Sequence, residues 1–131
     1  LDAKRDWGSA KDYCGAMYLI LQQSEPEDVV IATGETHTVR EFVERAFAVD
    51  EKKVDWEGTG SDEVGRDHIT ARILVKVSPE FYRPADVNLL LGDATKAKEK
   101  LGWRPYYSFN DIVSDMMRAE LKILNQNNNL T

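Results

Sequence analysis

Three segments of the chain have the form of a helix-capping box, and they constrain the fold more than any other feature. In each, a serine or threonine is followed three residues later by an acid, at residues 9–12, 38–41 and 108–111. The hydroxyl can accept a hydrogen bond from the start of a helix while the acid accepts one in return. Apolar residues repeat at helical spacing after each box. We therefore predict helices over about 9–23 and 38–48, and a last helix that begins at 108.

Short apolar, β-branched runs separate these helices. Residues 29–33, 54–56 and 73–77 are predicted strands, whereas the glycine-rich segment 58–70 is predicted to be an exposed loop. Asp93 is expected to cap a short helix that stops at Leu101 and Gly102. This order of helices and strands favours an α/β fold, with one domain over residues 1–124 and a polar tail over 125–131.

Composition excludes several classes of function. The formal net charge of -6 argues against general affinity for nucleic acid, and no apolar run is long enough to cross a membrane. The single cysteine, Cys14, has no partner for an internal disulfide, and no basic-then-apolar leader precedes it. We therefore expect a cytoplasmic protein. Cys14 falls at an apolar helix position and is interpreted as a packing residue rather than a nucleophile.

Two arginines in aromatic-flanked segments are the candidate binding residues. Arg5 opens an Arg-Asp-Trp-Gly segment, and Arg83 lies in the segment Phe-Tyr-Arg-Pro-Ala-Asp. A guanidinium gives two parallel hydrogen bonds to an anion and keeps its charge, as a diphosphate clamp requires. Two plainer readings stay open: Arg5 could form a surface ion pair with Asp6, and Arg83 could anchor a turn.

Groups that perform chemistry are missing from the sequence. It contains no glycine-rich phosphate turn, no Tyr-x-x-x-Lys pair and no cysteines or histidines spaced for a metal. His37 has no nucleophile near it in the sequence, and Trp7 and Trp103 adjoin helix boundaries, so all three are interpreted as structural. We predict no catalytic, cofactor-binding or metal-binding residue, and the chain resembles half of an active site.

Residues 1–13, 31–42, 82–87, 90–97 and 100–105 together resemble the C-terminal part of the GDP-mannose 4,6-dehydratase family. These enzymes are extended short-chain dehydrogenases/reductases. The closing Leu-Gly-Trp-Arg-Pro piece is shared by many sugar-nucleotide epimerases and dehydratases, whereas the two arginine motifs together are more specific. The resemblance implies a substrate-binding lobe packed on an N-terminal Rossmann domain that this chain lacks. It also implies that the chain contributes a strand and a helix to the larger sheet.

The resemblance further implies roles for three residues. Arg5 and Arg83 would hold the diphosphate of GDP-mannose, and Asp86 would contact the nucleotide end of the ligand. Asp86 stands where the family has glutamate, which shortens its reach by one methylene, and Tyr82 stands where the family has phenylalanine. NADP and the catalytic threonine, glutamate, tyrosine and lysine would belong to the Rossmann domain.

The activity that this implies is conversion of GDP-mannose to GDP-4-keto-6-deoxymannose, by internal hydride transfer through NADP and loss of water. We expect the isolated chain to be inactive, and its uncovered apolar surface to favour a homo-oligomer. Two alternatives stay open. The chain could be the same lobe of another sugar-nucleotide epimerase or dehydratase, or a noncatalytic module whose helices dock a partner.

Overall fold

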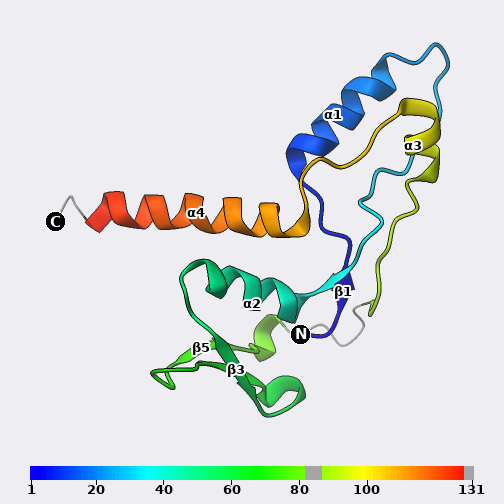
Figure 1. Cartoon of the computed structure of the whole chain (residues 1–131). Coiled ribbons are helices and arrows are strands. Elements are labelled where there is room, and N and C mark those ends of the chain that lie inside the picture. The colour runs from blue at the N-terminus through cyan, green and yellow to red at the C-terminus, as the bar shows by residue number, and fades with distance from the viewer. Residues whose placement is uncertain (82–86, 129–131) are drawn as a thin grey trace.

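The computed structural model describes residues 1–81 and 87–128 as a small α/β fold, as expected (Figure 1). Figure 1 shows α1 and α3 together at one end, a small sheet beneath α2 at the other, and α4 extending outward. The helices are α1 (Ala10–Leu21), α2 (Val39–Val49), α3 (Thr95–Leu101) and α4 (Phe109–Asn128), with short 3-10 turns at Gly60–Asp62 and Pro79–Phe81. The strands are β1 (Lys4–Arg5), β2 (His37–Thr38), β3 (Val54–Glu57), β4 (Val64–Asp67) and β5 (Ile73–Lys76).

Two of the three predicted capping boxes form completely. Thr38 and Glu41 exchange both hydrogen bonds at the start of α2, and Ser108 and Asp111 do the same at the start of α4. The third forms only by half. Ser9 accepts from the amide of Lys11, but the acid of that box turns away from the helix start to a distant partner, described below.

That acid is Asp12, which is buried. Its carboxylate accepts hydrogen bonds from the backbone amides of Tyr106 and Tyr107, each at 3.1 Å. The Asp12 carboxylate therefore bonds to two backbone amides of the segment before α4 and not to the backbone amide of Ser9 at the helix start. A local capping pattern could not predict this long-range contact.

The prediction of an exposed loop over residues 58–70 is wrong, because this segment contains β4. This strand pairs with both β3 and β5 in an antiparallel sheet of order β3-β4-β5. A Cβ added at Gly65 would lie 2.7 Å from Cγ1 of Val54 and 3.0 Å from the ring of Trp56. Gly65 is thus needed because the Val54 and Trp56 side chains of β3 lie close against its backbone.

The prediction of a strand over residues 29–33 is also wrong, because no regular strand forms there. Ala32 is buried, but the segment has no ladder partner. Among the described residues, the backbone amides and carbonyls of residues 29–32 form no hydrogen bond. The apolar, β-branched composition of residues 29–33 suits a buried strand. A strand does not form because no described segment supplies the hydrogen bonds of a ladder.

The main core lies between α1 and α3. Ala16 and Ala97 are fully buried there, together with Trp103, whose indole Nε1 donates to the carbonyl of Asp12 at 3.0 Å. The apolar residues that repeat at helical spacing along α1 are only partly covered, since Met17 is 61% and Leu21 80% exposed. Cys14 is exposed, which contradicts its interpretation as a packing residue.

Aromatic rings join the start of α4 to α2. Phe42 stacks on Trp7 at 4.9 Å between ring centroids and meets Phe109 edge-on at 6.1 Å. The ring of His37 stacks on Phe109 at 3.9 Å. Trp7 and His37 therefore have structural contacts, as expected. In the described part of the chain, no helix has the length and apolar character needed to span a membrane.

A small ion cluster ties the segment after α1 to α3. Both carboxylate oxygens of Glu27 accept from Nζ of Lys100, at 2.6 and 2.7 Å, and Lys96 lies 2.9 Å away. The hydrogen bonds from these two lysines lower the pKa of Glu27 to about 2. The cluster holds α3 against the chain that leads to residues 29–33.

We expect Glu27→Gln to lower the melting temperature at neutral pH and to have no effect in strong acid. The folded protein holds the Glu27 pKa below its ordinary value of 4.5, so the ion cluster stabilises the fold above that pH. This contribution is lost as the pH falls through about 2. Melting curves of wild type and variant across this range measure it, with Glu25→Gln as a control for a neighbouring acid. A difference that is independent of pH would contradict the expectation.

Candidate functional site

The site is built around β1, which has neighbours on both edges. On one edge it pairs antiparallel with β2, with Lys4 opposite Thr38 and Arg5 opposite His37. On the other edge the amide of Lys4 donates to the carbonyl of Asn88 at 2.8 Å, and the amide of Leu90 donates to the carbonyl of Lys4 at 3.1 Å. The strand that carries the first arginine motif is therefore bonded to the segment that follows the second.

The Arg5 side chain reinforces this contact. Its Nη1 donates to the carbonyl of Val87 at 2.7 Å and to that of Lys4 at 2.8 Å. Arg83 and Asp86 lie outside the described residues. Arg83 is only four residues before Val87, and four residues of extended chain span at most about 14 Å. The structure thus brings Arg5 and the flank of the second motif together.

Asp6 is a residue of the site whose role sequence reasoning missed. Its carboxylate accepts from the amide and the hydroxyl of Thr33, at 2.9 and 2.6 Å, and from the amide of Gly34 at 2.9 Å. Gly34 has φ +82°, a conformation that favours glycine. The signal in the sequence was the Thr-Gly pair that ends the apolar run. Asp6 fixes Arg5's motif to this turn.

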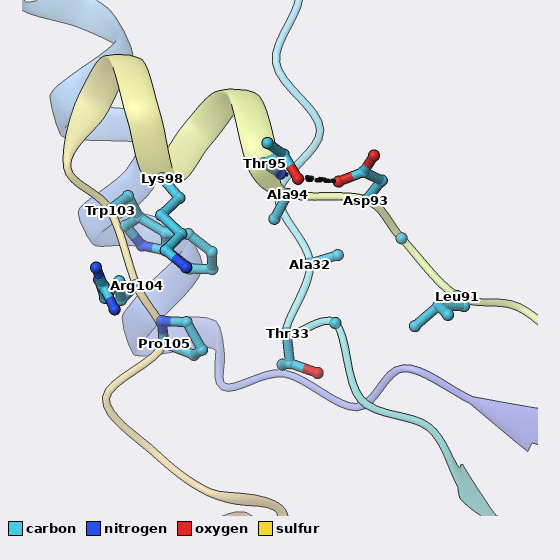
Figure 2. Close-up of a pocket in the computed structure, with 12 residues that line it drawn as sticks. Ala32, Thr33, Leu91, Asp93, Ala94, Thr95, Lys98, Trp103, Arg104 and Pro105 are labelled. Atoms are coloured by element: carbon cyan, nitrogen blue, oxygen red, sulfur yellow. Dashed lines mark hydrogen bonds between the residues drawn. The ribbon is translucent and has the colours of Figure 1, made fainter.

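A second feature is a cavity of about 620 Å³ that Thr33 and Gly34 of the same turn help to line, together with residues 91–95 and 103–105 (Figure 2). Figure 2 shows Ala32 and Thr33 on one wall, Leu91 and Asp93 on another, and Trp103 to Pro105 on a third. The two extended walls touch, because a Cβ added at Gly92 would lie 2.2 Å from Cβ of Ala32.

The polar groups of the cavity lie mostly at its edge. Lys98 and Arg104 line it, and both are exposed. The Asp93 carboxylate accepts from the amide of Thr95 at 2.9 Å and from its hydroxyl at 2.6 Å. These bonds lower the pKa of Asp93 and hold the start of α3, although the capping position itself is Ala94. Arg5 does not line this cavity, and Arg83 and Asp86 lie outside the described residues.

Comparison with known proteins identifies the family. The model for the family described as GDP-mannose 4,6 dehydratase matches residues 1–116. The chain belongs to this family. It is 52% identical over 129 residues to the human GDP-mannose 4,6 dehydratase, with 98% of the chain aligned, and 50% identical over 127 residues to the Drosophila melanogaster enzyme, with 97% aligned. A bacterial relative from Sinorhizobium fredii is 47% identical over 124 residues, or 95% of the chain.

The chain corresponds to only part of these dehydratases. It spans 35% of the length of the human and Sinorhizobium fredii proteins and 32% of the Drosophila protein. The family resemblance read from the two arginine motifs and the flanking segments is confirmed. The assignments of Arg5, Arg83 and Asp86 to the ligand stay predictions.

The described residues do not fit the cofactor that the dehydratase family implies. A dinucleotide is held where a parallel strand meets a helix through a glycine-rich turn. Both sheets in the described part of the chain are antiparallel, of two and three strands. Within residues 1–81 and 87–128 no group of three potential metal ligands occurs either.

Proposed function

We propose that this chain is the substrate-binding part of a GDP-mannose 4,6-dehydratase, in which Arg5 and Arg83 bind the diphosphate and Asp86 binds the nucleotide end. The observation that carries the proposal is the pairing of β1 with residues 88–90. It links the strand of Arg5 to the chain that immediately follows Arg83 and Asp86. Arg5 and Val87, which are 82 residues apart in the sequence, thereby become neighbours in space.

The contacts of Arg5 suit this role. Two carbonyls hold Nη1, so the guanidinium already has a fixed direction before a ligand arrives. An ordered side chain loses less conformational entropy on binding, which favours affinity. Because the net charge is -6, we expect a diphosphate to be drawn to local cations and not to the surface at large.

Under this proposal the chain contributes binding and orientation to the reaction. GDP-mannose would be converted to GDP-4-keto-6-deoxymannose, with NADP and the catalytic side chains held by the part of the enzyme outside this chain. Contacts to the diphosphate would fix the mannose ring against those groups, and such remote binding accelerates the chemical steps. The isolated chain is expected to have no dehydratase activity.

We also propose that the remaining part of the enzyme covers the cavity and the segment 29–33. Within residues 1–81 and 87–128 the backbone groups of residues 29–32 have no hydrogen-bond partner, as at the edge of a sheet. Val30 is 55% and Leu91 56% exposed on the same side of the core. A strand of the N-terminal domain placed against residues 29–33 would satisfy both. We further expect the complete enzyme to be a cytoplasmic homo-oligomer.

We expect Arg5→Ala and Arg83→Ala each to weaken binding of GDP-mannose by about 10- to 100-fold, the loss expected for a charge-assisted hydrogen bond. Calorimetric titration of the full-length enzyme that carries this segment measures the dissociation constant. Arg118→Ala is the control, because this exposed arginine lies on α4, away from β1. Unchanged affinity in both variants would contradict the proposal.

The same titration distinguishes the remaining alternatives. Competition among GDP-, UDP- and dTDP-linked sugars is expected to favour the guanine nucleotide. Preference for a pyrimidine nucleotide would instead assign the segment to another sugar-nucleotide enzyme. A noncatalytic interaction module would bind none of them and would show no stabilisation by nucleotide.

A further inference from the structure

Arg40 is at the centre of a charged cluster that joins three elements of the fold. It lies in the first turn of α2, and its Nη1 donates to Oε1 of Glu63 at 2.6 Å, just before β4. Its Nε and Nη2 donate to Oδ1 of Asp2, at 3.3 and 3.0 Å, just before β1. One guanidinium thus connects the strand of Arg5, the helix α2 and the three-stranded sheet.

The Arg40–Glu63 pair is more sheltered than an ordinary surface ion pair, whereas the Asp2 side chain is 83% exposed. The Arg40 side chain is 24% exposed and the Glu63 side chain 10%. The guanidinium lies over the ring of Trp56 at 4.7 Å, and the Trp56 Nε1 in turn donates to Glu44 at 2.8 Å, one turn further along α2. The Glu63 hydrogen bond raises the pKa of Arg40, so the guanidinium keeps its charge. Three side chains, those of Asp2, Glu63 and Trp56, therefore contact the guanidinium, and Glu44 holds the Trp56 ring.

The backbone beside Arg40 holds the same strand. The amide of Arg40 donates to the carbonyl of Leu1 at 3.0 Å, and the amide of Val39 donates to the carbonyl of Ala3 at 3.2 Å. The start of α2 therefore fixes the chain leading into β1 at two carbonyls, and the Arg40 side chain fixes it at the Asp2 carboxylate. Asp2 is separated from Arg5 by only Ala3 and Lys4.

We propose that Arg40 is a positioning residue for substrate binding, acting on Arg5 through Asp2 and β1 while Glu63 anchors it to the sheet. The inference rests on the proposed function, because it assigns Arg40 a role in placing a side chain that binds GDP-mannose. Arg40 itself need not touch the ligand. A lysine is expected to replace it only in part, because a single ammonium cannot hold Asp2 and Glu63 with the geometry of a planar fork.

We expect Arg40→Met, which keeps the aliphatic stem, to raise KM for GDP-mannose about tenfold and to leave kcat largely unchanged, as loss of uniform binding does. Arg40→Lys is expected to give a smaller increase in the same direction. Steady-state kinetics of the full-length enzyme carrying this segment measure both. Arg45→Met is the matched control, since Arg45 is an exposed arginine on the same helix. The control is expected to leave KM unchanged.

The decisive comparison repeats Arg40→Met in an Arg5→Ala background. If Arg40 acts through Arg5, the second substitution adds no further increase in KM, because residues acting as a unit are not additive. A full additional increase would overturn the inference, as would an unchanged KM in both Arg40→Met and Arg40→Lys. If Arg5→Ala alone leaves KM unchanged, the proposed function fails together with the role of Arg40. If Arg5→Ala raises KM but Arg40→Met and Arg40→Lys do not, only the role of Arg40 fails. Arg40→Lys preserves the test if Arg40→Met does not fold.

Discussion

Trp103→Ala is expected to lower the free energy of unfolding by about 3–5 kcal/mol, the range for removing a large aromatic side chain from a core. Trp103 is 6% exposed and packs with the fully buried Ala16 and Ala97 between α1 and α3. The substitution would leave a cavity in the core cluster, against which partly buried residues such as Leu19, Ile31 and Leu101 also pack. It would also remove the hydrogen bond from Nε1 to the Asp12 carbonyl.

Chemical denaturation followed by far-UV circular dichroism measures this loss. Trp103→Phe separates the contribution of packing from that of the hydrogen bond, because it retains a ring but removes the Nε1 donor. We expect it to lower the free energy of unfolding by about 1–3 kcal/mol. Tyr106→Ala is the control for an aromatic residue in the same segment, since Tyr106 is 85% exposed. A loss in Trp103→Ala no greater than that of the control would show that the α1 and α3 pair does not depend on this residue.

Asp6→Ala is expected to lower the free energy of unfolding by about 2–3 kcal/mol, given the usual contribution of hydrogen bonds to a charged group. The carboxylate accepts three hydrogen bonds from Thr33 and Gly34, and these link β1 to the turn beside the large cavity. Asp6→Asn keeps one acceptor oxygen and should lose less. The result separates the roles of two adjacent residues, since Arg5→Ala is expected to affect ligand binding far more than stability.

Parallel denaturation and GDP-mannose titration of the Arg5→Ala and Asp6→Ala variants, in the full-length enzyme that carries this segment, test that separation. We expect the Asp6 variant to have a lower free energy of unfolding. Its affinity for GDP-mannose should fall only if the substitution displaces β1. The Arg5 variant should bind poorly and lose less stability than the Asp6 variant, because its bonds to the Val87 and Lys4 carbonyls are exposed. The opposite pattern would mean that Asp6 contacts the ligand and Arg5 holds the fold together.

Local features of this fold could be predicted from the sequence. The capping boxes at Thr38 and Ser108 involve residues three apart, so their hydrogen bonds follow from the sequence alone. The end of α3 at Gly102, which has φ +64°, is local in the same way. The family could also be identified, because its motifs are contiguous segments.

Features that depend on distant partners could not be predicted. Asp12 fits a capping box, yet its carboxylate bonds to amides more than 90 residues away. Residues 29–33 have the composition of a strand, but a strand forms only where a neighbour supplies the ladder. In the sequence Arg40 is only an interior residue of the capping segment 38–41. Its contacts with Asp2 and Glu63 depend on the fold.

The position of β1 between residues 37–38 and residues 88–90 has a consequence for the order of folding. The sheet β3-β4-β5 joins residues close in sequence and can form early, whereas β1 needs a partner more than 80 residues downstream. During synthesis, Arg5 leaves the ribosome among the first residues of this segment but acquires its final neighbours only after Leu90 has emerged. The strand β1 is therefore expected to be among the last parts of the segment to reach its native pairing, and the sheet β3-β4-β5 among the first.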